Sequence, residues 1–175
     1  EITTRLVGSE MCIRDRFISI RMEEQHVRSY LQIQETRYHD IMEYHILIDP
    51  ELYGYQIPKM TLQPIVENAL YHGIKCKRSK GQICIRGEKK QDLLILTVTD
   101  DGVGMEEADL QDLQKEIEKP CKQTDRGFGL ANVNERLHMY FGAEYGVKIA
   151  SRPGEGTQVT IVIPAVHNVT GEAIT

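Results

Sequence analysis

The residues best suited to chemistry lie in three short segments. Residues 62–73 read LQPIVENALYHG, residues 100–105 read DDGVGM, and residues 126–130 read RGFGL. The first segment carries an amide and an imidazole, the second a carboxylate followed by glycines, and the third two glycines. A single nucleotide with its metal ion would use all of these groups, so their joint order along one chain favours a nucleotide site.

The carboxylate segment is suited to recognising a base. Asp100 directly follows the apolar run 93–99, and Gly102 and Gly104 come next. A carboxylate at a strand end can accept the exocyclic amino group of adenine, as acidic side chains accept the amino group of cytosine. Because glycine has no side chain, the backbone there can turn sharply and approach a flat base. We therefore expect Asp100, Gly102 and Gly104 to form a base pocket.

The other two segments are suited to phosphates and a metal ion. Asn68 and His72 are one helical turn apart and share a helix face. An amide oxygen can ligate Mg²⁺, which keeps several waters and bridges to nucleotide phosphates, and an imidazole can donate to a phosphate oxygen. Gly127 and Gly129 open a further helix, where free N–H groups and the helix dipole favour phosphate. For either pair alone, an ordinary structural role would explain the residues equally well.

Hydrophobic periodicity and turn residues predict alternating helices and strands that position these segments. The expected elements are a helix over 17–41, a strand over 44–48, a loop over 51–58, a helix from an N-cap at Thr61 to His72 with a stop at Gly73, strands over 83–87 and 93–99, a long polar loop over 106–126 containing a short helix, a helix over 127–141, and a hairpin with strands over 147–150 and 158–163.

The long first helix has a narrow apolar seam at heptad spacing. Its members are Val27, Leu31, Gln34, Tyr38 and Ile41. A seam of this kind predicts burial against a partner helix. Packing on the helix's own domain is the alternative.

Composition excludes several classes of protein. The 175 residues carry a formal net charge of -5, so we expect no nucleic-acid partner, because phosphate neutralisation requires basic surfaces. No apolar run reaches the roughly 18 residues of a membrane span, and the four cysteines, Cys12, Cys76, Cys84 and Cys121, form no C-x-x-C pair. We expect free thiols in a cytoplasmic polypeptide. Residues 1–16 fit neither periodicity, and we interpret them as a non-native segment, since MCIRDR looks like translated adapter sequence.

The three segments, together with GEGTQVTIVIP at residues 154–164, resemble the N, G1, G2 and G-T boxes of the GHKL (HATPase_c) ATP-binding superfamily. The segments YLQIQETRYHD (residues 30–40) and IPKMTLQPIVENA (residues 57–69) are most similar to the YesM/LytS-type sensor histidine kinases. The resemblance implies an α+β two-layer sandwich, the Bergerat fold, in which a mixed sheet packs on helices after one long helix. It also implies the end of a dimerisation helix at 17–42, an ATP-binding catalytic domain at 43–164 and a flexible tail at 165–175.

The resemblance also assigns a site. It implies ATP and Mg²⁺ as ligands, with Asn68 on the metal, Asp100 reading adenine, and the polar stretch 106–126 as the ATP lid. The ATP-binding residues that it implies are Asn68, His72, Asp100, Gly102, Gly104, Met105, Gly127, Gly129, Leu130 and Thr157. Tyr71 stands where the family usually has Lys, and Lys75, one turn on, is the candidate to supply that cation.

By the same resemblance the chain is the catalytic part of a two-component sensor histidine kinase. It would present the γ-phosphate of Mg-ATP to a histidine on an upstream dimerisation domain of a homodimer, and a response regulator would receive it. The intact protein would be anchored in the bacterial membrane. The family's acceptor motif, P-H-F, is absent from this chain. Glu67 is the candidate catalytic base.

Two other functions remain open from the residues. One is a noncatalytic nucleotide-binding interaction module of the same fold. The other is a GHKL ATPase or serine kinase, which places a glutamate one turn before the metal-binding asparagine. That position is Pro64 here, and proline cannot act as a base.

Overall fold

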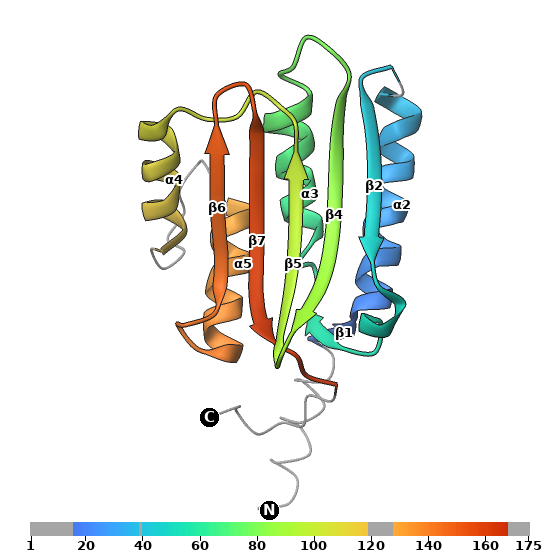
Figure 1. The fold of residues 1–175 in the computed structure, drawn as a ribbon, viewed down its shortest axis with the longest axis vertical. Coiled ribbons are helices and arrows are strands. Elements are labelled where there is room, and N and C mark those ends of the chain that lie inside the picture. The colour runs from blue at the N-terminus through green and yellow to red at the C-terminus, as the bar shows by residue number, and fades with distance from the viewer. Residues whose placement is uncertain (1–15, 39, 119–127, 168–175) are drawn as a thin grey trace, which may run out of the picture.

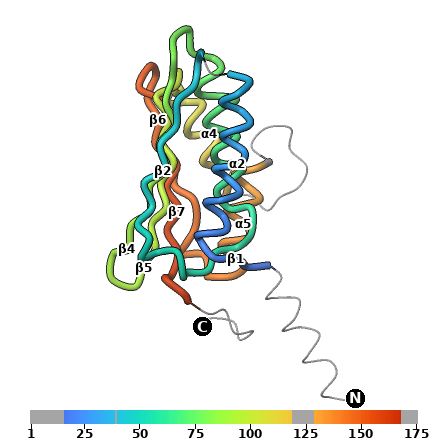
Figure 2. The backbone as a smooth tube through the Cα atoms, turned by 90° about the vertical axis from the view of Figure 1, so that its right-hand side faces the viewer, coloured from blue at the N-terminus to red at the C-terminus, as the bar shows by residue number. Residues whose placement is uncertain are grey.

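The computed structural model describes residues 16–38, 40–118 and 128–167, which form two layers (Figure 1). A five-stranded sheet makes one layer and the helices cover one of its faces, as Figure 2 shows. This confirms the predicted fold class. The elements are β1 (Phe17–Ser19), α2 (Ile20–Tyr38), β2 (Met42–Ile48), the short 3₁₀ turn η1 (Pro50–Leu52), β3 (Gln56–Pro58), α3 (Gln63–Asn68), the π-helical turn η2 (Ala69–Ile74), β4 (Gly81–Lys90), β5 (Leu93–Asp100), α4 (Glu107–Glu118), α5 (Phe128–Phe141), β6 (Gly146–Arg152) and β7 (Gly156–Pro164).

The sheet is mixed, with strand order β2-β4-β5-β7-β6. The β2–β4 pair is parallel and the remaining pairs are antiparallel. Burial alternates along β5, where Leu94, Leu96 and Val98 are buried and their neighbours are half-exposed. Because strand side chains alternate between faces, this pattern leaves one face of β5 for the helices and the other toward solvent.

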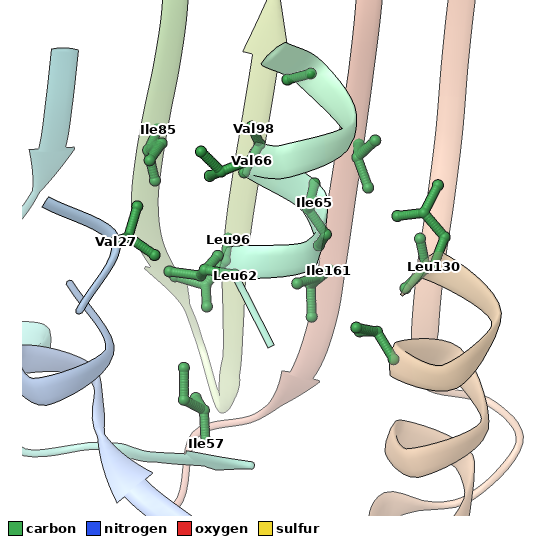
Figure 3. Close-up of a cluster of buried hydrophobic side chains, with 14 of the residues drawn as sticks. Val27, Ile57, Leu62, Ile65, Val66, Ile85, Leu96, Val98, Leu130 and Ile161 are labelled. Carbon is green, nitrogen blue, oxygen red and sulfur yellow. The ribbon is translucent and has the colours of Figure 1, made fainter. Parts of the chain in front are cut away.

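The core lies between the sheet and α3. In Figure 3, Ile65 and Val66 lie over Leu96, Val98 and Ile161 of the sheet, and Ile65 and Val66 are fully buried. Fully burying a side chain of this size stabilises the fold by roughly 1.5–3 kcal/mol. This packing places the polar side chains of α3 at the rim of the sheet.

The first helix packs on its own domain. Val27 and Leu31 have at most 1% of their surface exposed and belong to the same core as the sheet. The expectation that the seam meets a partner helix is therefore wrong for these two residues: the seam completes the core beside α3 and β2. The helix also begins later than expected, because residues 17–19 pair with β3 as β1.

The segment after Thr61 differs from the expected helix in two ways. Thr61 is not an N-cap: its hydroxyl donates to the carbonyl oxygen of Pro58 at 2.6 Å. The helix then widens into η2 and continues past Gly73 to Ile74. The expected stop at Gly73 is wrong, because this glycine serves close packing: a Cβ there would collide with the Asp100 carboxylate.

The C-terminal half largely follows the predicted pattern. The hairpin is confirmed as β6 and β7, paired from residue 146 to residue 162. The polar stretch contains a helix, α4, that is longer than expected. The expected tail is wrong for residues 165–167, since the Gln56 N–H donates to the Val166 oxygen at 2.8 Å and His167 stacks on Tyr55. Residues 1–15 and 168–175 lie outside the described residues, so the non-native start stays a prediction.

No helix within the described ranges is long and apolar enough to cross a bilayer. Of the four cysteines, Cys76 and Cys84 lie in the described part of the chain and both are free thiols, as expected there.

Candidate nucleotide-binding site

A cleft of about 900 Å³ opens between α3–η2, the ends of β5 and β7, and α4. Seven of the ten residues expected to bind ATP line this cleft: Asn68, His72, Asp100, Gly104, Met105, Gly129 and Thr157. Gly102 and Leu130 lie behind its wall, and Gly127 lies outside the described residues. The structure thus brings together groups from all three segments, which are up to 61 residues apart between Asn68 and Gly129.

Asp100 is the buried acceptor of the cleft, with only 4% of its surface exposed. Burial raises the pKa of its carboxyl to about 6, although hydrogen bonds from the backbone of Gly102 and Thr157 act in the opposite direction. The Gly102 N–H donates to Oδ1 at 2.9 Å, and Thr157 is the cross-strand neighbour of Asp100. Asp100 is therefore fixed in position and largely ionised at neutral pH, as an acceptor for an amino group must be.

The glycines after Asp100 shape the wall in different ways. A Cβ on Gly102 would collide with the backbone of Gly73 in η2, so Gly102 lets the turn approach η2 closely, and it is not among the residues that line the cleft. Gly104 lines the cleft and has φ +66°, a left-handed conformation that glycine adopts without strain. The turn after β5 thus needs Gly102 for close approach and Gly104 for its backbone conformation.

Ser151 of β6 ties this turn to the sheet. The Met105 N–H donates to Ser151 Oγ at 3.0 Å, and that hydroxyl lies 2.9 Å from Thr157 Oγ1 and donates to the Gly156 oxygen at 2.8 Å. Sequence reasoning missed Ser151, because its partner Met105 is 46 residues away and no local pattern marks the contact.

Asn68 and His72 line the opposite wall, at the junction where α3 widens into η2. π-Helical turns inside helices are frequent at functional sites. No three His, Cys, Asp or Glu side chains gather to hold a metal ion in the described ranges. The Asn68 amide fits a Mg²⁺ ion that shares its remaining ligands with phosphates and water, as Mg²⁺ usually does.

Glu67 also faces the cleft, where the Gln63 amide donates to its Oε1 at 3.0 Å. Lys75, the candidate to supply the cation that position 71 lacks, is not among the residues that line the cleft. Its ammonium lies 3.8 Å from the Tyr71 ring centroid and 4.3 Å from that of Tyr38. A hydrogen bond from this ammonium lowers the pKa of Tyr38. The cation is thus held on two aromatic faces outside the cleft lining.

The helix α4 contributes an acidic wall. Asp109, Asp112 and Glu116 line the cleft from positions that share one face of the helix. Sequence reasoning missed them, although their spacing of three and four residues was the available signal. His72 is the only basic side chain among the described lining residues. A polyanionic phosphate chain entering this cleft would need a cation beside it.

Asn134 of α5 connects α4 to β6. Its side chain is buried, donates to the Ile117 oxygen of α4 at 2.9 Å and accepts from the Val147 N–H of β6 at 2.9 Å. Gly129, in the first turn of α5, lines the cleft. Leu130 is 1% exposed and packs into the core (Figure 3), and it is not among the residues that line the cleft.

Comparison with known proteins connects this cleft to a family. Residues 58–167 match the model of the histidine kinase-, DNA gyrase B- and HSP90-like ATPase family (HATPase_c). The sensor histidine kinase YesM of Bacillus subtilis is 31% identical over 94% of the chain, and the sensor protein LytS of Bacillus anthracis is 35% identical over 86%. The chain spans about a quarter of the length of these curated relatives, 27% and 25%.

Solved structures share the fold. The mycobacterial sensor histidine kinase MprB matches with a TM-score of 0.58 at 20% identity, over 86% of this chain and 98% of that one. A catalytic domain of the histidine kinase ThkA matches with a TM-score of 0.59 at 17% identity, over 86% and 96%. The family match covers more than half of the chain, and the chain therefore belongs to the histidine kinase-, DNA gyrase B- and HSP90-like ATPase family.

Proposed function

We propose that this chain is the ATP-binding catalytic domain of a sensor histidine kinase and that it binds Mg-ATP in the described cleft. The observation that carries the proposal is the buried Asp100 carboxylate at the strand end, beside Thr157 and opposite Asn68. A fixed anionic acceptor suits the amino group of adenine. The acidic lid wall suits a nucleotide that arrives with its own cation.

Each lining residue then has a role. Asp100 accepts from the adenine amino group, and the exposed His72 donates to a phosphate oxygen. Asn68 holds Mg²⁺, which neutralises the phosphate charge when it is bound. The N–H groups in the first turn of α5, at Gly129, face the phosphates. Phosphoryl transfer depends mainly on positioning and charge stabilisation, so this arrangement supplies most of what the reaction requires.

The phosphoryl acceptor is a histidine of the intact protein, on an upstream dimerisation domain. Glu67, which lines the cleft and accepts a hydrogen bond from Gln63, is the candidate to accept the imidazole proton. A homodimer, a cognate response regulator and anchoring of the intact protein in the bacterial membrane complete this proposal. The sequence relatives named YesM and LytS, both called sensors, support it.

The ATPase or serine-kinase alternative lacks its base. Pro64 lies one turn before Asn68 and also lines the cleft, so no carboxylate projects from that position. The noncatalytic binding module differs from the kinase only in phosphoryl transfer, and an experiment separates the two.

The test mixes this chain with radiolabelled Mg-ATP and a separate fragment carrying the native upstream acceptor helix. The expected product is acid-labile phosphohistidine on that fragment, and less of it should form at subsaturating ATP when the chain carries Asp100→Asn. Tight ATP binding without transfer would refute the kinase and support the binding module. No ATP binding at all would refute both.

A further inference from the structure

One buried carboxylate lies outside the cleft and is not used by the proposed reaction. Glu23 of α2 has 1% of its surface exposed. Its Oε2 accepts from the Met60 N–H at 3.1 Å and its Oε1 accepts from the Leu62 N–H at 2.8 Å. Both partners lie in the turn that leads into α3. A buried carboxylate is costly without partners, and here it has two.

The same turn is held from a second side. Arg136 of α5 donates through Nη2 to the Met60 carbonyl oxygen at 2.8 Å. Burial lowers the pKa of Arg136, while the nearby charge of Glu23 acts against that effect. Met60 thus has its N–H bound to α2 and its carbonyl bound to α5, and it adopts φ +57°. A methionine rarely occupies that left-handed region unless the surroundings impose it.

The start of α3 depends on this contact. Leu62 is the N-cap residue, and no side chain of the local sequence caps it. Glu23 satisfies the Leu62 N–H from 39 residues away and brings a negative charge to the positive end of the helix. A capping side chain normally comes from the N-cap residue itself. Here the cap belongs to another helix, so the place of α3 is tied to the place of α2.

We propose that Glu23 and Arg136 are positioning residues that clamp the Met60 turn and so set the metal- and phosphate-binding wall of the cleft. This inference rests on the proposed function. The turn leads within one and two helical turns to Pro64, Glu67 and Asn68, which line the cleft. The adenine wall is carried by β5 and β7, whose register is fixed by sheet hydrogen bonds. Loosening the clamp therefore shifts one wall and leaves the other in place.

The test compares two ligands on the 175-residue chain and on a Glu23→Gln variant. AMP probes the adenine wall, Mg-ATP probes both walls, and displacement of a fluorescent ATP analogue reports both dissociation constants. Glutamine keeps one acceptor but offers an NH₂ group to the other backbone N–H. We expect the Mg-ATP affinity of the variant to fall by about five- to tenfold, which is the lower end of the affinity changes found for coupled sites. The AMP affinity should be unchanged.

Glu24→Gln is the matched control. Glu24 is the next residue of the same helix and is also buried, but its carboxylate pairs with Arg28 at 2.6 Å. The Glu24→Gln substitution removes one negative charge, as Glu23→Gln does. The ratio of the AMP dissociation constant to the Mg-ATP dissociation constant should stay at the wild-type value in this control. Arg136→Gln should lower that ratio as Glu23→Gln does, and it carries the test if Glu23→Gln fails to fold.

The outcomes separate the two proposals. Wild-type chain that does not bind Mg-ATP would overturn the proposed function and this inference with it. If the wild type binds Mg-ATP but Glu23→Gln leaves the ratio of the two dissociation constants unchanged, the clamp alone would be overturned. This includes the case in which the variant loses the same factor of affinity for both ligands. Loss of the fold in both clamp variants would assign the contact to stability and overturn its positioning role.

Discussion

Replacing Asp100 with asparagine should make the ligand-free protein more stable relative to the wild type at neutral pH than at acid pH, and it should weaken ATP binding. Burial raises the pKa of this carboxyl from 3.8 to about 6, so the folded state binds its proton more tightly than the unfolded state does. The resulting stability is fully present below about pH 4 and is lost as the pH rises through about 6. At 1.36 kcal/mol per pKa unit, the full effect is about 3 kcal/mol.

The assay is urea unfolding of the wild type and of Asp100→Asn at about pH 4.5 and about pH 7.5, followed by far-ultraviolet circular dichroism because the chain has no tryptophan. With pKa values of 3.8 in the unfolded state and about 6 in the folded state, protonation of Asp100 contributes about 2 kcal/mol to the unfolding free energy of the wild type at the lower pH and almost nothing at the higher pH. The variant's unfolding free energy relative to wild type should therefore rise by about 2 kcal/mol from acid to neutral pH. Other titrating groups cancel in this difference.

The binding half of the prediction follows from the same contacts. The asparagine oxygen would accept from the Gly102 N–H as Oδ1 does now, which turns the NH₂ group toward the adenine amino group. Two donors would then face each other, and ATP affinity should fall by about tenfold or more. A relative stability that stays constant between the two pH values would refute the buried-carboxylate argument, and unchanged ATP affinity would refute the adenine role of Asp100.

Three further changes test other parts of the structure. Gly73→Ala should abolish most ATP binding, measured by titration calorimetry, because its Cβ would collide with the Asp100 carboxylate; wild-type affinity would show that η2 can shift freely. Asn68→Asp should weaken ATP binding by about tenfold, since a further carboxylate beside Glu67 adds roughly 1 kcal/mol or more of repulsion; equal affinity would remove Asn68 from the site. Leu31→Ala should lower the unfolding free energy by about 2–5 kcal/mol at every protein concentration, and a loss that appears only at high concentration would instead place Leu31 in a dimer contact.

The sequence predicted the elements that depend on local patterns. A short apolar run marked β5, and the turn at Arg152 to Gly156 marked the β6–β7 hairpin, since strands and tight turns have short-range signatures. The seam of α2 was also visible. Periodicity identifies which face of a helix is buried but not what covers it, and the covering surface here is the helix's own domain.

The candidate site was predictable where chemistry follows from residue type. Asp100 and Asn68 were singled out because three segments suited to one nucleotide occur in order along the chain and resemble a known family, and both residues line the cleft. The contacts that hold them were not predictable. Ser151 and Glu23 act on partners 46 and 37 to 39 residues away, and such distances leave no local pattern.

The two walls of the cleft are held by different kinds of contact, and this difference bears on how the site can change. The adenine wall belongs to β5 and β7, where a continuous ladder fixes every residue from Leu93 to Asp100. The facing wall depends on a few side-chain contacts: Glu23 and Arg136 hold the turn before α3, and Asn134 and Gln114 bind α4 to α5 and β6. Losing one ladder bond leaves its neighbours in place, whereas losing one of these side chains removes one of the few polar ties of a helix. Changes in affinity should therefore arise on the helical wall, and base recognition should stay constant.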